Sequence, residues 1–458
     1  MTDAESGALA RVVSDDTLLV FLSDTHIGGT AGDDIFDSAA DLAALLDELN
    51  HHDGPVDLVL AGDFFDLLRM GDPGSGARNV AAVMSHPQHR DLFTALRGFA
   101  QSPRRRVVYL AGNHDPEIWW NADLQATLID AGLVDEFALS YRARFESRPG
   151  QLVYCEHGNQ FDPTNAIADY TDPLDTPLGS HVVTDVVRPI GAGIAITRRV
   201  NLRDVSYVFP LAAIPHWVTA RVFYQVMGQV LRWLALPLMV AYVAKEVFSA
   251  VAGMTELSQM LRSLLLGVGY DLLVLAVAVG LLFLVSRHTA RRVTATLSDH
   301  FGGHGADAAG SADAAGSSEQ PIRALLDSDR SPPMAPQVSA ADITVFLSGH
   351  THSPSIDQFH RGDGSAPVIV NTGCWLRQLQ PARTWLKAPP VFVPVFVQTH
   401  VRVRVVPEGL RVELWEHPRR AEQRLPALER VAIAGRAPRQ PEPGAKPRVA
   451  GARLSPDP

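Results

Sequence analysis

Five short apolar runs in this 458-residue chain are each followed by side chains that bind metal ions well. These side chains are Asp24 and His26, Asp63, Asn113, His157, and His350 with His352. Carboxylate, imidazole and amide donors suit hard or borderline divalent ions such as Mn²⁺, Fe²⁺ or Zn²⁺. The set contains no cysteine, which argues against a structural zinc site with thiolate ligands. A single Asp-x-His pair would mean little, but all five blocks in this order predict a site for two metal ions.

The runs that precede these side chains have the composition of β-strands. "TLLVFLSD", "VDLVLAGD", "RRVVYLAGNHD" and "QLVYCEHG" are rich in Val and Leu, and stretches with helical spacing, such as "IFDSAADLAALLDELN", lie between them. This alternation predicts an α/β layered fold. Loops at the carboxyl ends of strands in an open α/β sheet converge on one crevice. We therefore expect the five strand ends to deliver their side chains to one place.

The blocks "SDTHIG", "GDFFD", "GNHD", "HG" and "GHTH" resemble, in this order, the signature blocks of the calcineurin-like metallophosphoesterases. The resemblance covers roughly residues 18–158 and 342–373. It implies a central β-sandwich flanked by helices, with the metal ions at the edge of the sandwich. By this resemblance Asp24, His26 and His352 hold one metal ion. Asn113, His157 and His350 hold the other, and Asp63 bridges the two.

The same resemblance implies a metal-dependent phosphoric ester hydrolase. Two divalent ions activate water and orient the phosphorus atom for in-line attack, while they neutralise the developing charge. His114 resembles the family's histidine that faces the leaving group, as a general acid or a stabiliser of the transition state. Asp115 is expected to orient the imidazole of His114.

The blocks also resemble particular branches of the family. "SDTHIG" and "GDFFD" are similar to the branch that cleaves UDP-2,3-diacylglucosamine at its diphosphate, although that branch typically has arginine in place of His114 and lacks an inserted hairpin. The protein Ser/Thr phosphatases have arginine directly after the "GDxxD" block, where this chain has Leu67. The nuclease branch shares "SDTHIG" and "GNHD", but the net charge of -10 argues against binding to nucleic acid.

A strongly apolar region separates the fourth block from the fifth. "WLALPLMVAYVAKEVFSAVAG" and "LLLGVGYDLLVLAVAVGLLFLV" are each close to the ~20 residues that cross a hydrocarbon core. The turn between the two runs contains only Arg262. More arginines flank the outer ends of the pair, namely Arg221, Arg232, Arg287, Arg291 and Arg292. This asymmetry predicts a two-helix membrane hairpin with cytoplasmic ends. Lys245, Glu246 and Asp271 favour the alternative, a hydrophobic cap on the domain or at the membrane interface.

These patterns divide the chain into five segments. Residues 1–204 and 341–417 form the two parts of the metallophosphoesterase domain, 205–300 the membrane hairpin, 301–340 a disordered linker, and 418–458 a disordered tail. The N-terminus has no signal-peptide pattern, so the catalytic domain is expected on the cytoplasmic side of the cell membrane. Cys155 and Cys374 have no CxxC spacing and are expected to be reduced and buried.

The sequence thus predicts a membrane-anchored enzyme that hydrolyses a phosphoester or diphosphate bond. Its expected partners are the membrane and a phosphorylated small-molecule or lipid-linked substrate, and nucleic acid is not expected. One alternative is a tethered phosphodiesterase or nuclease that acts on a soluble nucleotide or nucleic acid. Another is a membrane binding module without catalytic activity, against which the complete set of metal-binding side chains argues.

Overall fold

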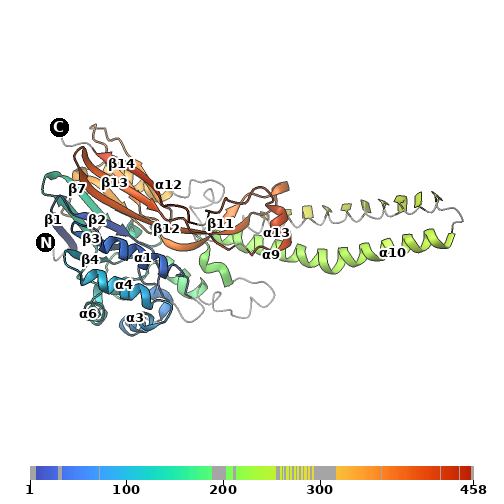
Figure 1. Cartoon of the computed structure of the whole chain (residues 1–458), viewed down its shortest axis with the longest axis horizontal. Helices are drawn as coiled ribbons and strands as arrows, with labels where there is room; N and C mark the ends of the chain where they lie inside the picture. Colours follow the sequence, from blue (N-terminus) through green and yellow to red (C-terminus); the bar gives the residue numbers. More distant parts are fainter. Residues whose placement is uncertain are drawn as a thin grey trace.

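The apolar runs form two β-sheets in the computed structural model, and a long helical projection extends from one end of them (Figure 1). The structure describes residues 7–28, 34–71, 73–187, 203–209, 213–253, 316–362, 364–422, 424–442 and 444–454, with short helical stretches between 258 and 292. The alternation of strands and helices in the first third of the chain is as the sequence predicted.

The first sheet contains the parallel strands from the start of the chain. Its strands, in order across the sheet, are β14 (Arg448–Leu454), β13 (Gly409–Glu416), β12 (Val391–Val406), β2 (Leu18–Leu22), β3 (Val56–Ala61), β4 (Arg105–Leu110) and β5 (Glu136–Ala138), and β11 (Trp375–Ala382) pairs with β12. β2, β3, β4 and β5 pair in parallel, whereas β12, β13 and β14 pair antiparallel. The carboxyl ends of β2, β3 and β4 therefore lie at the same edge.

The second sheet has six strands. In order across the sheet they are β1 (Ala8–Val13), β6 (Ser140–Phe145), β7 (Arg148–Glu156), β8 (Ile343–Ser348), β10 (Val368–Asn371) and β9 (Ser355–Gln358). β7 and β8 are parallel neighbours although the whole apolar region separates them in the sequence. The insertion therefore leaves this sheet after β7 and returns the chain to it at β8.

The two sheets pack face to face. Phe21, Val59 and Val108 of the first sheet share one buried cluster with Tyr141 and Leu347 of the second. The inner faces of both sheets are apolar and bury each other. The β-sandwich that the family resemblance implied is what the structure contains.

Helices cover the outer faces of both sheets. On the first sheet they are α1 (Ala39–Asn50), α2 (Leu67–Met70), α3 (Gly76–Ser85), α4 (Arg90–Ala100), α5 (Glu117–Trp120) and α6 (Ala122–Asp130). Leu92, Leu96 and Phe99 recur at helical spacing on α4 and are buried against this sheet. On the second sheet, Ile322 and Leu325 of α12 (Gly316–Leu326) are buried in the same cluster as strand residues.

The inserted region forms a long projecting helix with a returning partner. α9 (Ile214–Val230), a π-helical turn (Leu231–Ala235) and α10 (Leu236–Gly253) follow one another without a break, and described stretches between 258 and 292 run back beside them (Figure 1). The base of α9 is buried against β11 and β12 through Trp217 and Phe223. Large apolar side chains farther along are exposed, among them Trp233, Phe248 and Val251.

The expected membrane-spanning helices are not found in the described part of the chain, where no helix is both long and apolar enough to cross a bilayer. The second apolar run, residues 264–285, is described only in short stretches.

Two segments expected to be disordered contain regular structure. Residues 316–326 of the expected linker form α12, while 301–315 lie outside the described residues. The expected tail contains α13 (Ala427–Ala432) and β14, which pairs with β13 over seven residues from Arg448 to Leu454. The composition of the tail is rich in Pro, Arg and Glu, but strand pairing uses backbone groups that every residue except proline offers. Composition was therefore a poor guide at this sheet edge.

Candidate metal centre

The seven predicted ligands meet where the carboxyl ends of five strands from both sheets come together. Asp24 and His26 follow β2, Asp63 follows β3, and Asn113 follows β4. His157 follows β7, while His350 and His352 follow β8. The strand ends therefore bring these residues to one place, as predicted, and both sheets of the sandwich contribute to it.

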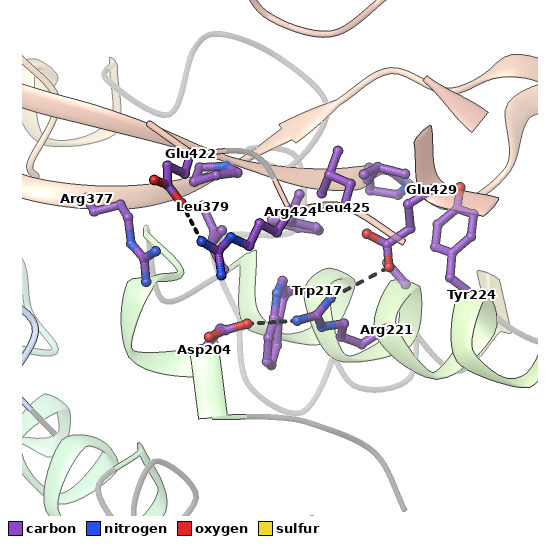
Figure 2. Close-up of a pocket in the computed structure, with 15 residues that line it drawn as sticks. Asp204, Trp217, Arg221, Tyr224, Arg377, Leu379, Glu422, Arg424, Leu425 and Glu429 are labelled. Atoms are coloured by element: carbon purple, nitrogen blue, oxygen red, sulfur yellow. Dashed lines mark hydrogen bonds and ion pairs between the residues drawn. The ribbon is translucent and has the colours of Figure 1, made fainter. Parts of the chain in front are cut away.

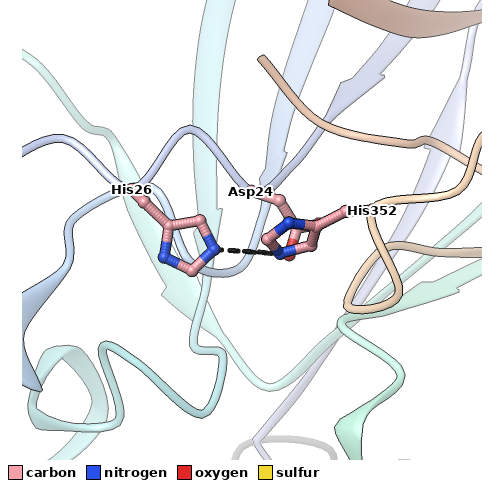
Figure 3. A group of neighbouring side chains, drawn as sticks. All are labelled: Asp24, His26 and His352. Carbon is pink, nitrogen blue, oxygen red and sulfur yellow. Dashed lines mark hydrogen bonds and ion pairs between the residues drawn. The ribbon is translucent and has the colours of Figure 1, made fainter. Parts of the chain in front are cut away.

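Asp24, His26 and His352 form the first group of side chains (Figure 3). The Nε2 atom of His352 lies 3.1 Å from Asp24 Oδ1 and 3.1 Å from His26 Nε2. The His26 Nε2 atom is 3.8 Å from the same carboxylate oxygen. All three side chains are buried. Three donor atoms thus converge on one small volume, as the ligands of a metal ion do.

Asn113, His157 and His350 form a second group. The Asn113 Oδ1 atom lies 3.2 Å from His157 Nε2 and 3.0 Å from His350 Nδ1. An amide oxygen and two ring nitrogens are a donor set for a borderline divalent ion. Each of these atoms belongs to a residue that the sequence assigned to the second metal.

Asp63 lies between the two groups. Its Oδ2 atom is 3.7 Å from His26 Nε2 in the first group and 3.2 Å from His157 Nε2 in the second. Its Oδ1 atom accepts a hydrogen bond from the backbone N–H of His114 at 2.8 Å. One oxygen is therefore fixed by the backbone while the other faces both groups, the arrangement that a bridging carboxylate needs.

The unused atoms of these residues fit bound cations. Asp24 Oδ2 accepts from the His350 N–H at 2.9 Å and from Ser23 Oγ, but its buried Oδ1 has no hydrogen-bond partner. A buried carboxylate oxygen without a partner is costly unless a cation compensates it. The His157 Nδ1–H donates to the Ala61 carbonyl at 2.9 Å, which leaves the Nε2 lone pair toward Asp63 and Asn113.

Backbone strain is concentrated at these residues. Five of the predicted ligands have positive φ: Asp24 (54°), His26 (48°), Asp63 (54°), His350 (68°) and His352 (57°). Apart from glycine, only Arg104 and Lys387 share this conformation among the described residues. Left-handed backbone is unfavourable for residues with a Cβ atom and persists where surrounding structure imposes it, often at functional sites.

Glycines beside the ligands allow the strand ends to approach closely. A Cβ atom on Gly112 would lie 2.2 Å from Asp63 Oδ1, and one on Gly349 would lie 2.4 Å from Asp24 Oδ2. Neither position has room for a side chain. The glycine of "GNHD" and that of "GHTH" therefore belong to the packing of the two carboxylates.

His114 is held by Asp66 and not by Asp115. The His114 Nδ1 atom lies 3.0 Å from Asp66 Oδ1. Asp115 instead accepts from Phe64 N at 2.9 Å, Tyr109 Oη at 2.6 Å and Gly112 N at 2.7 Å. The expectation that Asp115 orients the His114 ring is therefore wrong. Asp115 fixes the loops after β3 and β4, because its hydrogen bonds join both of them.

The electrostatics of the cluster favour positive charge. Burial opposes the charged form of His26, but Asp24, Asp66 and Asp63 outweigh this and raise the pKa of His26 to about 10. Burial likewise opposes charge on His157, while Asp63 raises its pKa to about 9. The carboxylates that favour protonated histidine rings would also favour divalent cations in place of those protons.

Two further residues contact the cluster. Asp162 Oδ2 lies 3.1 Å from His350 Nε2, and the Phe209 ring lies 4.3 Å from the His352 ring between centroids. Asp162 belongs to the stretch "HGNQFDPTN", which begins at the predicted ligand His157. The residue types of this stretch are equally typical of an ordinary turn. Phe209 lies far from every block, so no pattern in the sequence indicates its contact with His352.

The comparison with protein families agrees with this geometry. Residues 17–190 match the family model described as calcineurin-like phosphoesterase. This part of the chain is a calcineurin-like phosphoesterase domain. The match includes Asp24, His26, Asp63, Asn113 and His157, and the fold adds His350 and His352 from beyond it. No curated protein matches the chain.

The phosphoesterase domain therefore belongs to a metal-dependent enzyme. Bound divalent ions would supply Lewis-acid activation of water and of the phosphoryl group. Burial disfavours charge on Asp66, but His114, His26 and Arg69 hold its pKa well below the usual range. The ionised Asp66 therefore accepts the His114 Nδ1–H. This hydrogen bond fixes the orientation of the His114 ring.

Proposed function

We propose that this protein is a membrane-associated phosphoesterase that hydrolyses a phosphoester or diphosphate bond with two divalent ions. The position of Asp63 carries the two-metal part of this proposal. Its Oδ2 atom faces a histidine of each group, at 3.7 Å and 3.2 Å. In this scheme Asp63 contributes to both ions, which are Mn²⁺, Fe²⁺ or Zn²⁺.

The projecting hairpin supports membrane association. Exposed apolar side chains recur along it, including Trp233, Val240, Phe248 and Leu273. Large exposed apolar patches mark sites of interaction with a membrane or another protein. The arginines that flank the hairpin favour a membrane with the catalytic domain on its cytoplasmic side. A phosphate linked to a lipid, or held close to the bilayer, is the substrate that this arrangement suits.

Release of product by detergent-purified protein in the presence of Mn²⁺ tests the proposal. The substrates are a phosphomonoester, a phosphodiester and a lipid-linked diphosphate. We expect the wild type to hydrolyse the lipid-linked diphosphate fastest. Asn113→Ala removes a donor of the second group and should abolish hydrolysis, whereas Asn50→Ala at the end of α1 should not change it.

The other outcomes separate the alternatives. Hydrolysis of only the simple soluble esters would contradict a lipid-linked substrate and favour a tethered phosphodiesterase for soluble nucleotides. Failure to hydrolyse any substrate with Mn²⁺, Fe²⁺ or Zn²⁺ would contradict the enzymatic function itself. Equal activity of Asn113→Ala and the wild type would contradict the assignment of the second group to catalysis.

A further inference from the structure

A cavity of about 410 Å³ lies at the base of the projecting hairpin, between α9, strands β11 and β12, and the segment that leads into α13 (Figure 2). None of the predicted metal ligands lines it. Its volume lies within the range of small-molecule binding sites. The cavity is therefore separate from the metal centre and needs its own explanation.

Three guanidinium groups line this cavity. Arg221 lies between two carboxylates, with Nη2 2.7 Å from Asp204 Oδ2 and Nη1 3.6 Å from Glu429 Oε1. Arg424 pairs with Glu422 at 3.0 Å, and Figure 2 shows both of these arrangements. Arg377 has no carboxylate within ion-pair distance among the described residues, and its guanidinium group lies 4.1 Å from the centre of the Tyr207 ring.

The guanidinium groups offer more donors than their neighbours accept. The Nε atoms of Arg221 and Arg377 are buried and have no hydrogen-bond acceptor. The Arg424–Glu422 pair lies at the solvent side, with side chains 89% and 80% exposed, and such a pair contributes little. Arg377 and Arg424 are thus available to an anion. Planar guanidinium groups bind phosphate oxygens well because two parallel N–H bonds match them.

Besides the three arginines and the carboxylates that pair with Arg221 and Arg424, the cavity wall is mostly apolar. Leu379, Val391 and Phe392 are buried in the cluster that joins α9 to the sheet, and Trp217 of α9 belongs to the same cluster. A small inorganic anion would gain no binding energy from contact with these apolar side chains. An amphiphile with a phosphate group would gain from them, because its phosphate can reach the arginines while its apolar part contacts these side chains.

We propose that this cavity binds the phosphate group of an anionic phospholipid. Trp217 and Arg221 lie at the cavity, and the same helix continues into the part of the hairpin whose apolar side chains are exposed. If the hairpin enters a bilayer, the cavity lies at the level of the headgroups. This last step rests on the membrane association proposed above, whereas the chemistry of the cavity does not.

Binding of short-chain lipids to the detergent-purified full chain tests the proposal. Calorimetry measures the affinities of dihexanoyl phosphatidylglycerol, dihexanoyl phosphatidylcholine and inorganic phosphate. EDTA is present so that bound metal ions do not contribute to binding. We expect phosphatidylglycerol to bind most tightly. Arg377→Gln and Arg424→Gln should each weaken it by roughly tenfold or more, as loss of a charge-assisted hydrogen bond does.

Two controls accompany these variants. Arg377→Lys keeps the positive charge and should retain part of the affinity, which separates loss of charge from misfolding. Arg90→Gln makes the same change at an exposed position on α4 and should bind as the wild type does. Unchanged binding in both Arg377→Gln and Arg424→Gln would overturn the proposal. Equal affinity for inorganic phosphate would overturn the assignment to a lipid.

A parallel assay distinguishes this inference from the proposed function. Mn²⁺-dependent hydrolysis of bis(p-nitrophenyl) phosphate reports on the metal centre alone. Hydrolysis without binding of phosphatidylglycerol would overturn the lipid site and leave the phosphoesterase intact. Binding without hydrolysis would overturn the proposed enzymatic function and leave the lipid site intact.

Discussion

Asp162 connects the loop after β7 to the metal centre. Its Oδ2 atom accepts from His350 Nε2 at 3.1 Å, so the Nδ1 lone pair of His350 faces Asn113. Its own carboxylate is fixed by Thr164 N at 2.9 Å and by Asn165 Nδ2 at 2.7 Å. A carboxylate on the far nitrogen of a ligating histidine fixes the ring and raises its basicity. We therefore propose Asp162 as a positioning residue for His350.

Asp162→Asn should weaken Mn²⁺ binding by about 10-fold to 100-fold, because a neutral amide orients and polarises the His350 ring less well. Titration with Mn²⁺, followed by the signal of the free ion in electron paramagnetic resonance, measures this directly. Asp169→Asn makes the same change in the following turn, where Asp169 contacts Thr171, and should bind Mn²⁺ normally. Equal affinities for both variants would show that Asp162 only shapes its loop.

His400 on β12 should make the stability of the protein depend on pH, at a place remote from the metal centre. Its ring is buried, its Nε2 accepts from Arg402 Nε at 2.8 Å, and its Nδ1 lies 3.2 Å from His417 Nε2. Burial, followed by the charges of Arg402 and His417, holds the pKa of His400 well below 6.5. The folded protein therefore keeps this ring neutral, whereas the unfolded chain protonates it near pH 6.5.

Above about pH 6.5 the His400 ring is neutral in both the folded and the unfolded state, so it does not affect the free energy of unfolding. Below that pH only the unfolded state binds the extra proton. Below that pH the free energy of unfolding should fall by up to about 1.4 kcal/mol per pH unit for this one proton. His400→Gln should show a shallower fall in thermal midpoint between pH 6.5 and 5.5 than the wild type. Parallel profiles for the two proteins would contradict the assignment.

The turns at the strand ends bring the metal-binding side chains together. Gly112 follows β4, and a Cβ atom there would lie 2.2 Å from Asp63 Oδ1 and 2.7 Å from the backbone N of Asp63. The neighbouring atoms are backbone and a fixed carboxylate, so they have little freedom to move. The turn after β4 therefore sets the position of the Asp63 carboxylate.

Gly112→Ala should lower kcat by roughly 100-fold, because a displacement of about 1 Å at a catalytic group has an effect of this size. Gly98→Ala on α4, where the added methyl group contacts nothing, should leave kcat unchanged and raise stability by up to about 1 kcal/mol. Steady-state kinetics and thermal midpoints of both variants provide the comparison. Normal activity in Gly112→Ala would show that Asp63 tolerates displacement.

The sequence predicted the elements near the metal centre well because each strand there is a short apolar run that ends in a polar block. It could not predict the partner of His114, because Asp66 and Asp115 both follow strand ends and only the fold decides between them. β14 was missed because backbone pairing with β13 fixes it, and its side chains are mostly exposed. Residue composition carries little information about such a strand.

At the scale of the whole molecule, the adjacency of β7 and β8 explains how the domain tolerates its large insertion. The two strands remain parallel neighbours, with Tyr154 opposite Phe346 and Cys155 opposite Leu347. The hairpin begins and ends on the same side of the domain, where α9 packs against β11 and β12 (Figure 1). The metal centre and the hairpin can therefore act as separate parts of one protein.

The membrane association that we propose for the hairpin gives the final prediction. Phe248 and Val251 on α10 are 75% and 64% exposed, and a charged residue within a bilayer costs roughly 3 kcal/mol. Phe248→Asp combined with Val251→Asp should therefore reduce flotation with lipid vesicles strongly. Ile129→Asp combined with Leu174→Asp places the same charges at exposed apolar positions of the globular part. This control should leave flotation unchanged. Equal flotation of the two double variants would assign the hairpin's apolar surface to contact with another protein.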